Sequence, residues 1–199
     1  VARTGRLISK QFVDESRPGL TLLLDVRGYP YPATASKHTP FEWAVKVAAS
    51  IGDYALRQGY RLHLRADPDA GPPPMGALSR LPFLEYLARV QPTGRHSFED
   101  VLDTSAPSAS PCVVALLPWP DRDVLPPLID LRSRGVAVFV VLIDPASFPA
   151  GGPCAAPMAD DVRACGLEGA LIQFGRDWRE QLLSHDRVLA LEDYAHVYA

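Results

Sequence analysis

The alternation of apolar and polar residues predicts a strand, a helix and a second strand in the first third of the chain. Residues 20–24 form an apolar run that ends at Asp25, the pattern of a strand buried on both faces. Apolar residues recur at helical spacing over residues 42–58, after a Thr-Pro-Phe-Glu sequence that can cap a helix. Residues 60–66 alternate, which indicates a half-exposed strand near a sheet edge. This order predicts a βαβ unit.

The rest of the chain repeats this alternation of helical and extended segments. We expect helices over residues 78–90, 97–102, 125–134, 160–165 and 177–185, and strands over residues 112–117, 136–143, 170–174 and 188–191. Strands that alternate with helices imply a mostly parallel sheet with helices on both faces. We therefore predict an α/β, Rossmann-like fold. We also predict a single domain over residues 1–199, because no linker or shift in composition divides the chain.

Composition excludes several classes of protein. Lys and Arg number 20 against 23 Asp and Glu, a net charge of −3, whereas a dedicated nucleic-acid binder needs a basic surface. No apolar run approaches the roughly 20 residues that span a bilayer. The three cysteines form no Cys-x-x-Cys pair, which argues against a disulfide framework or a thiolate zinc site and favours a reducing compartment. These features predict a cytoplasmic soluble domain and name no activity.

The segments that follow the strands are the places to look for chemistry, because ligands of open parallel sheets bind beyond the carboxyl ends of the strands. These segments begin at Asp25, Pro118, Asp144 and Gly175. The segment after the first strand lacks the Gly-x-Gly-x-x-Gly fingerprint, and the chain has no P-loop, Gly-x-Ser-x-Gly or His-Glu-x-x-His motif. The best sequence signals of dinucleotide, nucleotide, serine-hydrolase and zinc-protease sites are therefore missing.

A family resemblance begins in the first 18 residues. Residues 2–12, Ala-Arg-Thr-Gly-Arg-Leu-Ile-Ser-Lys-Gln-Phe, lead into the strand that ends at Asp25, and this stretch resembles the bacterial family called domain of unknown function 58. Residues 42–59, and Pro92-Thr93-Gly94 before residues 98–102, are similar to later blocks of that family. The resemblance implies a von Willebrand factor A-like domain. It also implies that this chain is the C-terminal part of a longer, membrane-anchored bacterial protein that works beside a MoxR-type AAA+ ATPase.

Domains of this type often hold Mg²⁺ at a metal-ion-dependent adhesion site. The pattern is Asp-x-Ser-x-Ser after the first strand, a Thr from a second loop and an Asp after a later strand. The corresponding positions here, in that order, are Asp25, Arg27, Tyr29, His96 and either Pro118 or Trp119. Mg²⁺ needs oxygen ligands in near-octahedral geometry, and a guanidinium repels a cation and offers it no lone pair. We therefore predict a degenerate site without metal or cofactor, in which Arg27 pairs with Asp25 in place of the ion.

The resulting hypothesis is a noncatalytic protein-interaction domain, an adaptor or scaffold. Arginine and aromatic side chains are the types enriched at the centres of interfaces. The expected partner-binding residues are Asp25, Arg27, Tyr29, His96 and Trp119. The expected partner is a protein, and the resemblance names a MoxR-type ATPase; no nucleic acid is expected, and a membrane only through upstream segments.

Other interpretations stay open at this point. An enzyme or small-ligand site in the same crevice would use Asp25 and His96 as a base and its orienting partner, which must then lie within hydrogen-bonding reach. A crippled adhesion domain would retain weak ion binding, and a purely structural domain would bind nothing at these loops. At single positions, Asp25 also fits a loop-capping carboxylate, and Tyr29 fits a solvated loop residue.

Overall fold

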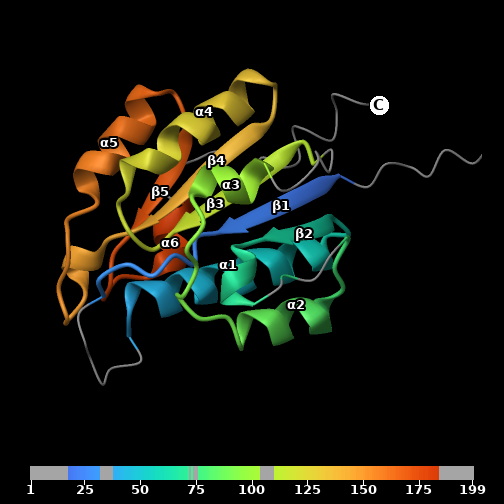
Figure 1. Cartoon of the computed structure of the whole chain (residues 1–199), viewed down its shortest axis with the longest axis horizontal. Helices are drawn as coiled ribbons and strands as arrows, with labels where there is room; N and C mark the ends of the chain where they lie inside the picture. Colours follow the sequence, from blue (N-terminus) through green and yellow to red (C-terminus); the bar gives the residue numbers. More distant parts are fainter. Residues whose placement is uncertain (1–17, 32–37, 72, 74–75, 104–109, 184–199) are drawn as a thin grey trace, which may run out of the picture.

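The structure is a computed structural model of the chain, and it describes residues 18–31, 38–71, 73, 76–103 and 110–183. Its centre is a parallel sheet of five strands in the order β2-β1-β3-β4-β5 (Figure 1). The strands are β1 (Gly19–Leu24), β2 (Arg61–Arg65), β3 (Cys112–Leu117), β4 (Ala137–Ile143) and β5 (Glu168–Ile172). The predicted α/β, Rossmann-like class is confirmed. The prediction of one domain over residues 1–199 reaches beyond the described residues and stays a prediction.

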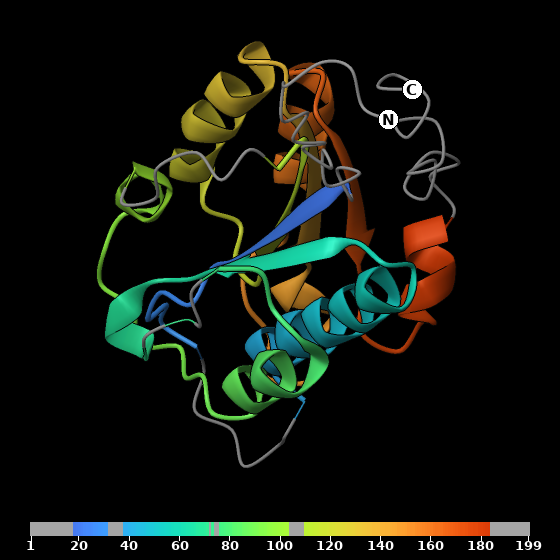
Figure 2. The ribbon, with the colours of Figure 1, turned by 90° about the vertical axis from the view of Figure 1, so that its right-hand side faces the viewer.

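Helices cover both faces of the sheet, as Figures 1 and 2 show. They are α1 (Pro40–Arg57), α2 (Arg80–Leu87), α3 (Phe98–Asp103), α4 (Leu125–Ser133), α5 (Ala156–Ala164) and α6 (Trp178–Leu183). Short 3₁₀ turns are η1 (Pro68–Ala70), η2 (Arg122–Val124) and η3 (Pro145–Ser147). One core cluster joins α1, α2 and α6 to the sheet, and a second joins α3, α4 and α5 to the opposite face.

Side-chain alternation in the strands separates these two cores. Leu22 and Leu24 of β1 belong to the core under α1, whereas Leu23 belongs to the core under α4. Such two-sided burial explains the continuous apolar run of this strand. The edge strand β2 buries Leu62 and Leu64 and leaves its alternate residues partly or fully exposed, which confirms the predicted half-exposed edge strand.

Local signals fix the ends of α1 where the sequence places them. The Thr39 hydroxyl accepts a hydrogen bond from the backbone N–H of Glu42 at 3.2 Å, so Thr39 is the predicted N-cap. Gly59 adopts φ +82° just past the helix, the left-handed conformation that glycine tolerates best.

Several predicted boundaries shift, and three of the shifts have a local explanation. Helix α2 begins after residue 79, since the Leu78 N–H donates to the Leu62 carbonyl at the sheet edge. Helix α5 begins near residue 156 rather than 160, with Pro157 in its first turn. Strand β5 ends at Ile172, because the next two backbone N–H groups donate to side chains of Gln181 and Ser147 instead.

Some sequence-based predictions fall on other parts of the chain. The family-like segment at residues 2–12 and the strand expected at residues 188–191 lie outside the described residues. Within the described part, none of the helices combines the length and apolarity that crossing a membrane would require.

Candidate functional site

Asp25 is the centre of the site at the carboxyl ends of the strands. The backbone N–H of Asp25 donates to the Leu116 carbonyl at 3.0 Å. This bond fixes Asp25, the residue after β1, against β3. Its side chain is 1% exposed. Oδ1 accepts from the backbone N–H and Nε of Arg27 at 3.1 and 3.0 Å, and Oδ2 accepts from Arg27 Nη2 at 3.0 Å and the Tyr29 hydroxyl at 2.7 Å. Asp25 therefore caps its loop and also accepts hydrogen bonds from the charged Arg27 guanidinium.

Arg27 forms the ion pair with Asp25 that the sequence predicts, and it also reaches a second carboxylate. Arg27 Nη1 lies 2.8 Å from Asp121 Oδ2, so one guanidinium joins the ends of β1 and β3. Its side chain is 18% exposed, and its guanidinium carbon lies 5.1 and 5.9 Å from the ring centroids of Tyr29 and Phe98. Burial acts to lower the pKa of Arg27, but the hydrogen bond and charge of Asp25 outweigh burial and raise it.

An aromatic cluster lies beside this ion pair. The rings of Tyr29 and Trp119 are stacked, with centroids 5.5 Å apart, and Tyr31 meets each of the two edge-on. Burial, followed by the charge and hydrogen bond of Asp25, raises the pKa of Tyr29, so its hydroxyl stays a donor. The interpretation of Tyr29 as a solvated loop residue is therefore wrong, because its ring is half-buried and its hydroxyl is bonded.

The loop that carries His96 runs next to the loop after β1. The Gly94 N–H donates to the Val26 carbonyl at 2.8 Å, and the Gly28 N–H donates to the Gly94 carbonyl at 3.1 Å. A side chain at position 94 would not fit, since its Cβ would lie 2.8 Å from Asp67 Oδ2 and 3.0 Å from the Val26 oxygen. The glycine at this position thus lets the two loops meet.

His96 pairs with Asp67 rather than with Asp25. Asp67 Oδ1 lies 2.8 Å from His96 Nδ1 and accepts from the Asp69 N–H at 2.8 Å, while Oδ2 accepts from the N–H groups of Arg95 and His96 at 2.6 Å each. Within the described part of the chain, no hydrogen bond joins Asp25 to His96, although both line the same small cavity. The base-and-orienter pair expected for an enzyme is therefore not formed.

Two groups of side chains bear on cation binding. Both oxygens of Asp25 already accept from Arg27, so a cation there would have to displace the guanidinium. Among the described residues, Asp67, Asp69 and His96 can offer three ligand atoms within 4.8 Å of one another. The Asp67 oxygens are occupied by backbone and imidazole groups, however, so a metal would have to break that arrangement.

The sequence interpretation missed Asp121 and Asp67 as members of this site. Asp121 comes two residues after Trp119 and accepts from the Asp123 N–H at 3.0 Å, as the cap of η2. Asp67 comes two residues after the end of β2 and caps η1. The usable signal was position, since carboxylates that follow neighbouring parallel strands lie at one edge of the sheet.

The crevice between these groups is very small. A cavity of about 10 Å³ lies among Asp25, Arg27, Asp67, His96 and the helix α3. A volume near 10–15 Å³ holds about one water molecule, whereas small-molecule pockets measure roughly 300–1,000 Å³. This crevice, as described, has no room for a metabolite.

The His96–Asp67 pair gives the site a pH dependence that can be measured. The hydrogen bond and charge of Asp67 raise the pKa of His96. The pKa of Asp67 is lowered, because hydrogen bonds from Asp69 and His96 outweigh its burial. Charged His96 contributes stability below its unfolded pKa of about 6.5, and this contribution is lost as pH rises through its folded pKa. Ionised Asp67 contributes stability at higher pH, and its contribution is lost as pH falls below about 4. His96→Asn should therefore reduce stability most between about pH 4 and 6.5, and least at pH values above the raised pKa of His96.

NMR titration of the imidazole signals checks this expectation. His63 on β2 is the internal control, because burial and the charges of Arg65 and Arg61 lower its pKa. We expect His96 to titrate above His63, and Asp67→Asn to bring the His96 pKa back toward about 6.5. The reverse order of the two histidines would contradict the pairing.

Comparisons with known proteins assign no family to the chain. The chain matches no protein-family model and no curated protein. Among solved structures it is similar to YcaC from Pseudomonas aeruginosa with hexane-2,5-diol and covalent acrylamide, at 15% identity and a TM-score of 0.38 over 96% of this chain and 98% of that chain. A similarity of this size carries no argument about the site. The α/β, Rossmann-like class rests on the parallel sheet with helices on both faces.

Proposed function

We propose that this chain is a noncatalytic protein-interaction domain that docks a protein partner at its strand-end surface. We define this surface as Asp25, Arg27, Tyr29, His96, Trp119 and Asp121. The first five are the residues that the sequence predicts, and Asp121 is added because it shares the Arg27 guanidinium. The same proposal includes a degenerate adhesion site, in which Arg27 pairs with Asp25 in place of a metal ion.

The observation that carries this proposal is the fixed Arg27 beside a crevice too small for a metabolite. Arg27 is held by two carboxylates, and Tyr29 and Trp119 are stacked next to it, so the groups are already ordered before any partner arrives. Ordered arginine and aromatic side chains lose little conformational entropy on binding, which favours affinity. A surface whose described crevice has no room for a metabolite suits a protein partner better than a small ligand.

The identity of the partner rests on the family resemblance. The Ala-Arg-Thr-Gly-Arg stretch and the blocks after it favour a von Willebrand factor A-like domain of the cytoplasmic part of a membrane-anchored bacterial protein. The same resemblance names a MoxR-type AAA+ ATPase as the partner to test first. The Rossmann-like order of strands and helices is compatible with both inferences.

Calorimetric titration of the chain with a purified MoxR-type ATPase from the same genome tests the proposal. We expect Trp119→Ala to weaken binding at least ~10-fold, as truncation of a buried aromatic anchor does at interfaces. Ile129→Ala is the matched control, because Ile129 is 38% exposed on α4 and is not one of the residues of the strand-end surface. Circular dichroism verifies that both variants fold.

Several outcomes would overturn the proposal. Absence of binding would exclude the MoxR-type ATPase as the partner. Equal affinity of the Trp119→Ala and Ile129→Ala variants would exclude the strand-end surface as the docking site. Binding that requires Mg²⁺ and is lost in Asp25→Ala would favour the crippled adhesion domain instead.

A further inference from the structure

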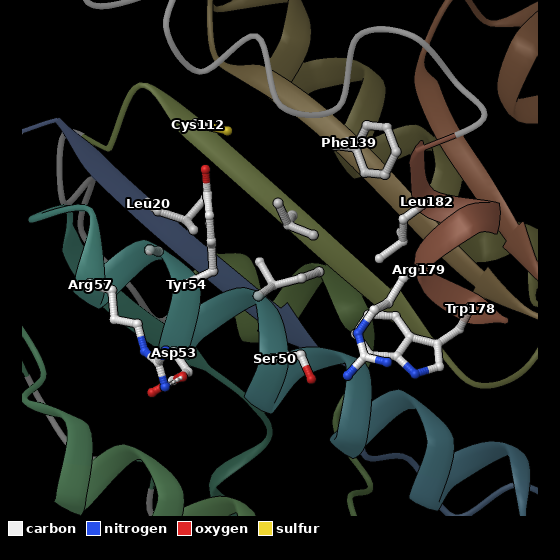
Figure 3. Close-up of a pocket in the computed structure, with 13 residues that line it drawn as sticks. Leu20, Ser50, Asp53, Tyr54, Arg57, Cys112, Phe139, Trp178, Arg179 and Leu182 are labelled. Carbon is white, nitrogen blue, oxygen red and sulfur yellow. Dashed lines mark ion pairs between the residues drawn. The ribbon is translucent and has the colours of Figure 1, made fainter.

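A second concave surface lies near the amino ends of the strands, apart from the strand-end surface. This α1–α6 groove has a volume of about 440 Å³ (Figure 3). Its floor includes Leu20, Cys112 and Phe139 of the sheet, and its walls include Tyr54 of α1 and Leu182 of α6. Its volume lies within the range of roughly 300–1,000 Å³ that is typical of small-molecule sites.

The interior of the groove is apolar. Leu20, Val114 and Phe139 line it from three neighbouring strands, and all three belong to the core cluster under α1. Figure 3 shows the α1 and α6 walls on opposite sides, with the strands behind them. Because these aliphatic and phenyl side chains offer no hydrogen bond, the part of a ligand that lies against them must be apolar.

The rim of the groove carries more positive than negative charge. The Asp53 carboxylate is shared by two guanidinium groups, with Arg57 Nη2 at 2.7 Å and Arg80 Nε at 2.6 Å. Arg179 is exposed on the α6 side and forms no ion pair with the residues that the structure describes. One carboxylate therefore stands against three guanidinium groups, and this balance complements an anionic ligand.

Arg179 is the rim group that is free to bind such an anion. Its guanidinium carbon lies 4.7 Å from the centroid of the Trp178 ring, and both residues line the groove. Trp178 is buried against the core cluster under α1, so its ring is a fixed support. The cation–π contact uses none of the guanidinium N–H groups, whose geometry matches a carboxylate in a bidentate pair.

We propose that the α1–α6 groove binds an amphipathic carboxylate, with its apolar body over Leu20 and Phe139 and its carboxylate bonded to Arg179. An aliphatic monocarboxylate is the simplest ligand with this chemistry. The proposal does not depend on the partner of the strand-end surface.

Calorimetric titration of the 199-residue chain with hexanoate, octanoate and decanoate at pH 7 tests the apolar part of the site. We expect the affinity to rise about 2–4-fold for each added CH₂ group, because each methylene is removed from water. Octanol is the uncharged match of octanoate. It should bind at least ~5-fold more weakly, because an alcohol cannot form the charged pair with Arg179.

Arg179→Gln tests the carboxylate contact, with Arg89→Gln as the matched control. Both arginines are exposed, and Arg89 does not line the groove. We expect Arg179→Gln to weaken decanoate binding at least ~5-fold and to leave octanol binding unchanged, whereas Arg89→Gln should change neither. Circular dichroism verifies that both variants fold. Equal decanoate affinities of the two variants would overturn the proposal.

The Cys112 thiol on the groove floor reports where the ligand lies. In the chain carrying Cys154→Ser and Cys165→Ser, Cys112 is the single cysteine left. Burial raises the pKa of Cys112 to about 11, so its alkylation by iodoacetamide is measured near pH 9. Decanoate at about ten times its dissociation constant should slow alkylation at least ~5-fold, because the bound form then predominates. Acetate at the same concentration, which lacks the apolar body, should not slow it.

Four results would overturn the proposal. One is the absence of decanoate binding, and another is decanoate binding that leaves the alkylation rate of Cys112 unchanged. Octanol affinity equal to that of octanoate would show that the groove binds apolar molecules without regard to charge. A decanoate affinity that falls as the protein concentration rises would identify a second copy of the chain as the occupant.

Discussion

Replacing Arg27 by methionine is expected to reduce the free energy of unfolding by about 3–5 kcal/mol at pH 7. The reason is Asp25, whose side chain is 1% exposed and which receives two guanidinium hydrogen bonds. Methionine keeps much of the packing against Phe98 but leaves the carboxylate with no cation. Urea unfolding followed by circular dichroism measures the loss.

A second substitution separates charge from packing. Asp25→Asn combined with Arg27→Met should recover most of the lost stability, because neither charge is then present. A double variant that loses the sum of the two single effects would show that the ion pair is unimportant.

The same substitution at another ion pair is the control. Arg122 Nε lies 2.6 Å from Asp161 Oδ2, with side chains 66% and 38% exposed. Arg122→Met should cost about 0–1 kcal/mol, as exposed pairs do. Equal losses in the Arg27 and Arg122 variants would contradict the role given to burial.

Replacing Phe83 by alanine is expected to cost about 3–5 kcal/mol, the range for a deleted core phenyl ring. Phe83 of α2 is 0% exposed and lies over Gly52 of α1, where a Cβ would sit 2.3 Å from Phe83 Cζ. Gly52→Ala should therefore also be destabilising, by about 1–3 kcal/mol, although alanine is the better helix former.

A double-mutant cycle tests this contact. In Gly52→Ala with Phe83→Ala, the new methyl group enters space that the ring has vacated, so the double variant should lose less than the sum of the single variants. Leu81→Ala on the same helix is the control and should change stability by less than about 0.5 kcal/mol, because Leu81 is 67% exposed. Strict additivity would contradict the contact between position 52 and the ring.

Local sequence patterns determine much of this protein. The apolar run before Asp25 predicts a buried strand, the alternation at residues 60–66 predicts an edge strand, and Thr39 predicts the start of α1. Each depends on residues within a few positions of one another, where the periods of strand and helix act. The pairing of Asp25 with Arg27 was predicted from the family resemblance, and the two residues lie only two positions apart after one strand.

The rest of the site is decided by the order of strands in the sheet. Arg27 bonds Asp121, 94 residues further along the chain, only because β3 lies next to β1. His96 bonds Asp67 across 29 residues, since Gly94 brings its loop against the end of β1. A hydrophobic pattern predicts which face of a strand is buried, but it does not predict which strand lies beside it. The sequence alone therefore determined the elements and the Asp25–Arg27 pair, and only the tertiary structure decided their long-range partners.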